Sequence, residues 1–194
     1  MKKIFLLLVV LLLLKDSYAQ SSKTTEPLYT DLAKALQEPE KVTRLKLSKK
    51  KLREVPEEIF LFKNLTELDL SHNKIDSLPE TIGTLENLQK LNVSSNKLTS
   101  LPSTIGELQK LETLSAARNN IQTLPPEIGD LQNLRYLNLW DNDLQNLPDE
   151  LGQLTELKEL ELRSILFSDE ERARLKKLLP KTKVNLSPSC NCQF

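Results

Sequence analysis

The chain has 194 residues and carries 27 basic and 27 acidic side chains, so its formal net charge is zero. Such a balance gives no electrostatic reason to expect a nucleic-acid partner or binding to an anionic membrane surface. The sequence also contains no phosphate-binding loop, dinucleotide fingerprint or zinc-ligand spacing, so we expect no cofactor and no metal site.

Residues 1–19 have the pattern of a secretory signal peptide. Two lysines precede an apolar run over residues 4–14, and small residues stand at the minus three and minus one positions of a cleavage site after Ala19. The run is too short to span a bilayer, and Lys15 and Asp16 interrupt it, although an uncleaved anchor is the alternative. We therefore predict an exported chain, located outside the cell, at its surface or in the periplasm, with no integral membrane span after cleavage.

Two segments lie between the signal peptide and the main part of the chain. Residues 20–26 are polar and predict a mobile lead-in. Residues 27–41 predict a helix that caps the N-terminal end, because four apolar residues recur at helical spacing before Pro39 stops the helix: Leu28, Leu32, Ala35 and Leu36.

Residues 42–167 consist of six units with a constant period of 23 residues and the pattern LxxLxLxxNxLxxLPxxIGxLxx. A period of this length is typical of a solenoid, whose units bury their apolar faces against one another. Apolar residues at positions 4 and 6 of each unit predict a short strand. Proline at position 15 and glycine at position 19 predict a short helical or 3₁₀ turn, the glycine standing just past its end, where φ is often positive. The fold class is therefore an α/β solenoid.

Position 9 carries an asparagine in four successive units: Asn73, Asn96, Asn119 and Asn142. A polar side chain among buried leucines must be hydrogen-bonded, or it costs about 1 to 3 kcal/mol. We interpret the four as a structural ladder in which each amide holds the backbone of its own unit and of the next. Binding of a ligand by these amides is the alternative.

Residues 168–186 predict a C-terminal cap. Ser168 and Glu171 have the spacing of a capping box that opens a helix, and residues 184–186 can return as a last edge strand. The tail, residues 187–194, contains Cys190 and Cys192. In an exported protein these thiols can oxidise, either to a strained bridge across one residue or between two chains, which would give an oligomer.

The LPxxIGxL half of the repeat resembles the 23-residue class of leucine-rich repeat proteins. The segment GDLQNLRYLNLWDNDLQNLP at residues 129–148, and LYTDLAKALQEPEKV at residues 28–42, are similar to the secreted leucine-rich repeat proteins of pathogenic spirochaetes, the leptospiral type. The resemblance covers residues 28–186. It implies a horseshoe with a parallel sheet on its concave face and short turns on its convex side, and a protein-binding role without one particular ligand.

In this pattern positions 3, 5, 7 and 8 face the concave side, and both large aromatic residues fall in unit five. Tyr136 and Trp140 are four residues apart and share a face with Asn138, and the neighbouring units add Arg118 and Arg163. Trp, Tyr and Arg most often carry binding energy at interfaces. These five residues are our candidate binding site for a protein, and the alternative is that Trp140 only covers the sheet near the C-terminal cap.

An enzymatic role has little support. His72 has only repeat-filling serines beside it, and Glu159 with Glu161 resembles a carboxylate pair but is explained by solvation on an end strand. We predict no catalytic residues. The predicted function is an exported protein-binding module, with host proteins among the candidate partners, and the alternative is a structural or envelope-assembly scaffold without a host partner.

Overall fold

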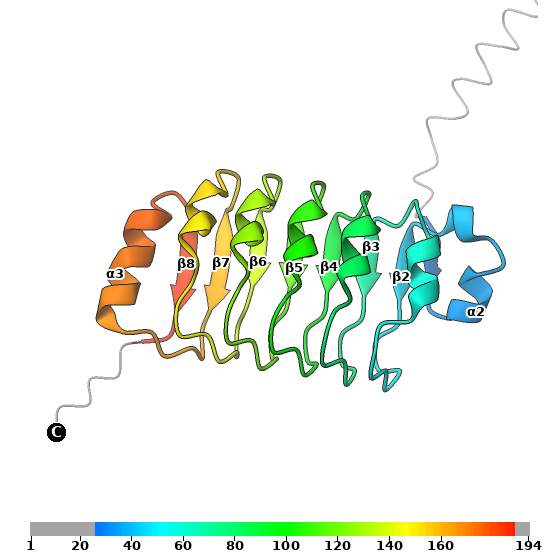
Figure 1. Ribbon diagram of the computed structural model, residues 1–194, viewed down its shortest axis with the longest axis horizontal. Helices are drawn as coiled ribbons and strands as arrows, with labels where there is room; N and C mark the ends of the chain where they lie inside the picture. The colour runs from blue at the N-terminus through cyan, green and yellow to red at the C-terminus, as the bar shows by residue number, and fades with distance from the viewer. Residues whose placement is uncertain (1–25, 189–194) are drawn as a thin grey trace, which may run out of the picture.

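The structure is a computed structural model that describes residues 26–188 and has the form of a solenoid (Figure 1). All strands of this part lie side by side, in chain order, in one parallel sheet. The strands are β1 (Leu28–Tyr29), β2 (Arg44–Lys46), β3 (Glu67–Asp69), β4 (Lys90–Asn92), β5 (Thr113–Ser115), β6 (Tyr136–Asn138), β7 (Glu159–Leu162) and β8 (Lys183–Leu186).

Short 3₁₀ helices form a second layer in front of the sheet in Figure 1. Each of these helices starts directly after the proline of position 15, which is the N-cap residue, with an extended ψ between 128° and 155°, and not the first helical residue that was expected. They are η2 (Glu57–Leu61), η3 (Glu80–Thr84), η4 (Ser103–Glu107), η5 (Pro126–Asp130) and η6 (Asp149–Gln153). The predicted α/β solenoid, with a parallel sheet and 3₁₀ turns on the opposite side, is confirmed.

The register of the sheet places equivalent positions of successive units beside one another. Leu68, Leu91 and Leu114, all at position 4, are direct neighbours across β3, β4 and β5. Their side chains point between the two layers and are at most 2% exposed. The core is thus one continuous stack in which each unit covers the apolar face of the next.

The N-terminal cap differs from the single helix expected over residues 27–41. Leu28 and Tyr29 instead form β1, which pairs with β2, and helix α2 (Leu32–Ala35) begins after Asp31, whose carboxylate accepts from Lys34 N at 3.2 Å. A 3₁₀ turn, η1 (Pro39–Lys41), completes the segment. A strand at this end satisfies edge N–H and C=O groups of β2, which a helix could not do.

The residue at position 8 has a positive φ in every unit, between 54° and 62°, although none of these residues is a glycine: Lys49, His72, Ser95, Arg118, Asp141 and Ser164. A side chain in this conformation costs about 1 to 2 kcal/mol. Hydrogen bonds to the following unit hold the turn in place, as between Arg118 N and Trp140 O at 2.7 Å. The turn directs position 9 back toward the core.

The glycines of position 19 lie inside the 3₁₀ helices, and none of the four has a positive φ, contrary to the sequence interpretation. They are needed for close approach. A Cβ on Gly129 would stand 2.5 Å from Glu150 O, and one on Gly106 would stand 2.6 Å from Glu127 O. Glycine therefore lets successive 3₁₀ helices pack against each other's backbones.

The asparagines of position 9 form a ladder, but it runs to the preceding unit and not to the next one. Asn119 Nδ2 donates to Ala116 O at 2.9 Å within its unit and to Val93 O at 3.1 Å in the unit before, while its Oδ1 accepts from Leu98 N at 3.0 Å. Asn73, Asn96 and Asn142 repeat this arrangement. The ladder thus ties the exit of each strand to the unit behind it.

The C-terminal cap is built from helix α3 (Asp169–Leu178) and strand β8. Ser168 accepts from Glu171 N at 3.2 Å, but Glu171 does not reach back to complete the predicted capping box. Its carboxylate accepts from Leu147 N at 3.1 Å and binds Arg174, which also donates to Asp149 and Leu147 O. Glu171 therefore attaches α3 to unit five, where its carboxylate has more hydrogen-bond donors than at the N-terminus of α3.

Several predicted segments lie outside the described residues. These are the signal peptide of residues 1–19, most of the lead-in, and the tail cysteines Cys190 and Cys192. Within residues 26–188, no helix has both the length and the apolar character that crossing a membrane requires.

Candidate protein-binding site

The candidate site lies on the sheet face that the 3₁₀ helices leave uncovered. Because side chains alternate along a strand, the burial of position 4 places positions 3 and 5 on this outer, concave face. Tyr136 and Asn138 occupy these positions on β6, opposite Glu159 and Glu161 on β7. Trp140 follows two residues after the strand, where the chain has not yet turned toward the core.

Hydrogen bonds fix the orientation of Trp140. Asn138 Oδ1 accepts from Trp140 N at 3.1 Å, and the indole Nε1 donates to Ser164 Oγ at 2.9 Å. Trp140 is therefore half-buried, with its backbone N–H bonded within unit five and its indole N–H bonded to unit six. Asn138, predicted as a binding residue, has a structural role in this arrangement, since Asp69 and Asn92 make the same turn in their units.

Arg118 covers the other side of the indole. Its guanidinium carbon lies 4.3 Å from the centre of the Trp140 ring, which is the geometry of a cation–π contact. Arg118 Nε is also 4.0 Å from an Asp141 carboxylate oxygen. At an exposed site a cation–π contact is worth about 0.5 to 1 kcal/mol, enough to favour one orientation of both side chains.

A concave pocket of about 310 Å³ brings most of the predicted residues together. Tyr136, Asn138, Trp140 and Arg163 border it, whereas Arg118 does not and acts on the pocket only through Trp140. Four further residues line the pocket that the sequence did not assign to the site: Ser115, Leu137, Glu159 and Glu161. The repeat register could have identified three of them, because it places Ser115, Glu159 and Glu161, at positions 3 and 5 of neighbouring units, beside Tyr136 and Asn138.

The charges at the C-terminal side of the pocket neutralise one another. Glu161 is partly buried, which raises its pKa, but hydrogen bonds from the side chain and backbone of Arg163 outweigh this effect and hold the pKa below its ordinary value. Hydrogen bonds from Lys183 and Asn185 likewise lower the pKa of Glu159. Both carboxylates are therefore ionised at neutral pH and already partnered.

The N-terminal part of the same face is a second network of ion pairs. Glu67 accepts from Arg44 Nε at 2.6 Å and from Lys90 Nζ at 2.7 Å, and Lys46 lies 3.5 Å from Asp69. Partial burial raises the pKa of Glu67, yet the two cationic partners outweigh it and lower the pKa below 4.5. Between this network and Tyr136 the face carries smaller uncharged residues: Asn92, Ser94, Thr113, Ser115 and Ala117.

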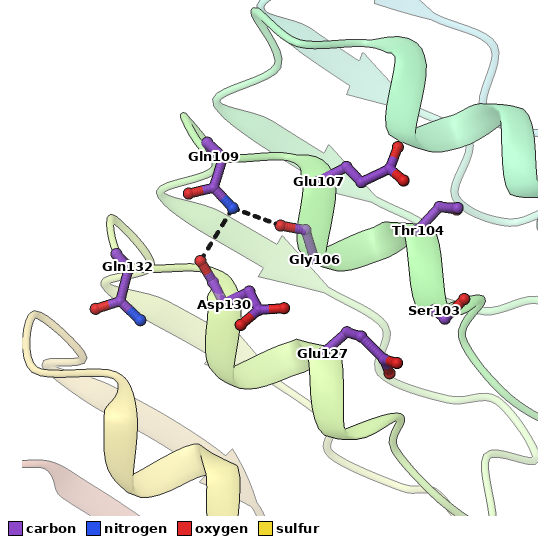
Figure 2. Close-up of a pocket in the computed structure, with 8 residues that line it drawn as sticks. All are labelled: Ser103, Thr104, Gly106, Glu107, Gln109, Glu127, Asp130 and Gln132. Carbon is purple, nitrogen blue, oxygen red and sulfur yellow. Dashed lines mark hydrogen bonds between the residues drawn. The ribbon is translucent and has the colours of Figure 1, made fainter.

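The convex side holds a larger hollow of about 550 Å³ between η4 and η5 (Figure 2). Its rim is acidic, with Glu107, Glu127 and Asp130, while Gln109 Nε2 bridges Gly106 O at 2.6 Å and Asp130 O at 3.1 Å. Among residues 26–188, no three His, Cys, Asp or Glu side chains are placed to hold a metal ion. We interpret this hollow as a seam between two units that the glutamine amide closes.

Comparison with known proteins assigns the class of protein. A family model described as "Leucine-rich repeat region" matches residues 34–117 and 90–183, which together make up more than half of the chain. The chain therefore belongs to the leucine-rich repeat family. A comparison with curated proteins gave no match.

Solved structures place the chain more closely. A Leptospira interrogans leucine-rich repeat protein is 36% identical with a TM-score of 0.68, and the match covers 84% of this chain and 47% of that protein. Internalin C2 from Listeria monocytogenes is 28% identical with a TM-score of 0.69, covering 84% of this chain and 68% of internalin C2. The predicted resemblance to the leptospiral type is confirmed, and this chain spans about half the length of the Leptospira protein.

A more distant similarity shows the fold alone. The ectodomain of the Arabidopsis thaliana membrane receptor kinase GASSHO1/SCHENGEN3, solved in complex with Casparian strip integrity factor 2, is 24% identical with a TM-score of 0.62. The match covers 76% of this chain and 18% of that ectodomain. The leucine-rich repeat family is typical of protein-interaction scaffolds, and neither the family match nor the Leptospira and Listeria structures indicate a catalytic family.

Proposed function

We propose that this protein is an exported protein-binding module that holds its partner on the concave face, at the pocket formed by Tyr136 and Trp140. The observation that carries the proposal is a prepared aromatic surface. Tyr136 is 46% exposed, although most large apolar and aromatic side chains among residues 26–188 are buried or partly buried. Beside it, Trp140 is held in a single orientation by Ser164 and Arg118.

The energetics of association favour such a surface. Ordering a flexible side chain at an interface costs about 0.5 to 1.5 kcal/mol, and the contacts of Trp140 meet this cost before a partner arrives. The neighbouring charges are paired within the protein, so an incoming surface does not have to neutralise them. Aromatic residues at the centre with satisfied polar groups around them are the usual arrangement of an interface hot spot.

The same geometry argues for recognition without catalysis. A general acid at neutral pH needs a raised pKa, whereas cationic partners lower the pKa of Glu159 and Glu161. His72 is exposed on a tight turn, and its nearest candidate nucleophiles belong to the repeat pattern. We accordingly assign these residues to the ion pairs and turns of the solenoid.

Export rests on the signal-peptide pattern of residues 1–19. Because the protein would then act outside the cytoplasm, host proteins are candidate partners. Fractionation of the producing cells tests this part. Mature protein in the medium or at the surface supports a recognition role, whereas retention in the envelope with self-association supports the alternative of an assembly scaffold.

The binding site is tested with three variants in a partner-capture assay. Tyr136→Ala, and Tyr136→Ala with Trp140→Ala, are compared with the double variant Leu61→Ala and Leu166→Ala, which removes other exposed apolar side chains. We expect the first two to lose partner binding by about tenfold or more, as hot-spot truncations of at least ~1.4 kcal/mol would. Unchanged affinity in a folded Tyr136→Ala, Trp140→Ala protein would reject the site.

A further inference from the structure

A row of lysines lies along the rim of the solenoid where the chain leaves the strands of units one to three. We call this set the basic rim: Lys49, Lys50, Lys51, Lys74 and Lys97. All five side chains are exposed. The same part of unit four carries Arg118, which pairs with Asp141, and that of unit five carries Asp141 and Asp143, so the lysines of the rim lie in its N-terminal half.

The repeat places three of these lysines at equivalent positions, although Lys51 alone of the three has a positive φ, 61°. Lys51, Lys74 and Lys97 all occupy position 10 of their units. Lys74 N donates to Leu52 O at 2.7 Å and Lys97 N donates to Ile75 O at 2.8 Å, so each position 10 is bonded directly to the unit before it. Successive units are therefore about 5 Å apart along the row, the spacing of paired strands. Lysine side chains on adjacent units carry like charges that repel one another weakly in water, and an anion bound against them relieves this repulsion.

The basic rim is not neutralised by the protein. None of its lysines forms an ion pair with a described carboxylate, whereas Arg44, Lys46 and Lys90 on the neighbouring sheet face are all paired. Two carboxylates, Asp76 and Glu54, belong to the same rim segments and make no ion pair with these lysines. Glu54 lies instead at a hollow on the convex side of the first two units, together with Glu57 and Glu58.

The composition of the basic rim selects a class of ligand. Protein interfaces usually need an aromatic or apolar anchor, and lysine is depleted from their cores. Single-stranded nucleic acid needs aromatic side chains on which its bases stack. The described exposed large apolar residues, which are Leu28, Leu61, Tyr136 and Leu166, all lie outside the basic rim, so it also has no residue to insert into a bilayer. These features favour a ligand that is recognised through its charge alone.

We propose that the basic rim binds a linear anionic polymer without bases, such as a sulfated polysaccharide or a polyphosphate chain. The row is one lysine wide over units two and three, which matches a single extended chain of anions. This site is separate from the concave pocket at Tyr136, so each of the two proposals can fail without the other.

The test measures binding of the purified protein to two fluorescent probes, a heparin octasaccharide and a defined polyphosphate, over a range of salt concentrations. The variant is Lys51→Gln, Lys74→Gln, Lys97→Gln. Its matched control is Lys176→Gln, Lys177→Gln, Lys181→Gln, which removes the same charge from exposed lysines at the C-terminal cap. Loss of three contacts is expected to weaken binding about tenfold or more at low salt and to reduce the slope of log K against log salt by about 2.

The control variant and the Tyr136→Ala, Trp140→Ala variant are expected to bind both probes as the wild type does. Binding of either probe with this pattern supports the proposal, and the comparison between the probes tells sulfate from phosphate. The proposal is overturned if the wild type binds neither probe at low salt, or if the two lysine variants weaken binding equally. Tighter binding to phosphatidylglycerol vesicles or to polyglutamate than to both probes would also overturn it.

Discussion

The asparagine ladder makes a graded prediction about stability, because its rungs share acceptors. Val93 O and Ala116 O each accept from two ladder amides, one in their own unit and one in the next. Leu139 O, at the end of the ladder, accepts from Asn142 alone among the described residues, because Ile165 stands at position 9 of unit six. Removing an inner rung and removing the last rung should therefore have different costs.

Asn119→Ala leaves one buried group without its partner, the N–H of Leu98, because both carbonyls keep a second donor. We expect a loss of about 2 kcal/mol from the free energy of unfolding, within the ~1 to 3 kcal/mol of one orphaned buried group. Asn142→Ala leaves both Ile121 N and Leu139 O without partners. Its cost should be about 4 kcal/mol, since two such groups are orphaned.

Chemical denaturation with linear extrapolation measures both values, and an unchanged denaturant slope shows that the unfolding transition is still comparable. Asn120→Ala is the matched control, because Asn120 is an exposed neighbour whose side chain takes no part in the ladder, and its effect should stay within about 0.5 kcal/mol. An Asn142→Ala variant no less stable than Asn119→Ala would refute the reasoning that shared acceptors protect the inner rungs.

Three further substitutions test other parts of the fold. Gly129→Ala should destabilise by about 2 kcal/mol because its Cβ meets backbone, whereas Gly152→Ala meets a movable leucine side chain and should cost less. Glu67→Gln should lower stability at pH 7 by about 0.5 to 1 kcal/mol. Because the pKa of Glu67 is lowered in the folded protein, its carboxylate contributes stability above about pH 4.5, and this contribution is lost as the pH falls through the lowered pKa. The melting temperatures of variant and wild type should therefore converge on acidification. Arg174→Ala should cost about 2 kcal/mol and increase amide exchange first in α3. The first argument is contradicted if Gly129→Ala and Gly152→Ala lose equal stability. The second is contradicted if the melting-temperature difference for Glu67→Gln persists at pH 3, and the third if Arg174→Ala increases amide exchange uniformly.

The fold could be predicted in detail wherever the sequence repeats. A 23-residue period with in-register leucines leaves one way to bury position 4 of every unit, and the observed pairing of Leu68, Leu91 and Leu114 follows from it. The period also locates the prolines that open the 3₁₀ helices. Contacts between units are where the prediction was less successful.

The glycines and the position 8 turn show why. Glycine was expected for its backbone freedom, yet its role is to let the next 3₁₀ helix approach, which only the packed solenoid reveals. The positive φ falls at position 8, where the side chains are as different as Lys49, Ser95 and Arg118. No shared residue type marks that turn, because hydrogen bonds to the following unit hold it in place.

The ends of the solenoid escaped prediction for a related reason. An exposed sheet edge has unpaired N–H and C=O groups, and the nearest backbone segment can pair with them. Leu28 and Tyr29 therefore form a strand, although the segment has helical spacing. Glu171 likewise accepts a hydrogen bond from unit five, which the local capping-box motif does not predict. At the candidate site the aromatic pair was visible in the sequence, but the positioning by Asn138 and Ser164 depended on the folded turn.

The most direct test of the proposed function is site-specific photocrosslinking of the protein to its partner. A photoreactive residue placed at Thr113, on the concave face beside Tyr136, is compared with one placed at Thr84, on the convex side. The proposed concave site predicts a crosslinked partner from position 113 only, which disappears when Tyr136→Ala and Trp140→Ala are added. Equal crosslinking from position 84, or crosslinking from position 113 that survives these substitutions, would contradict it.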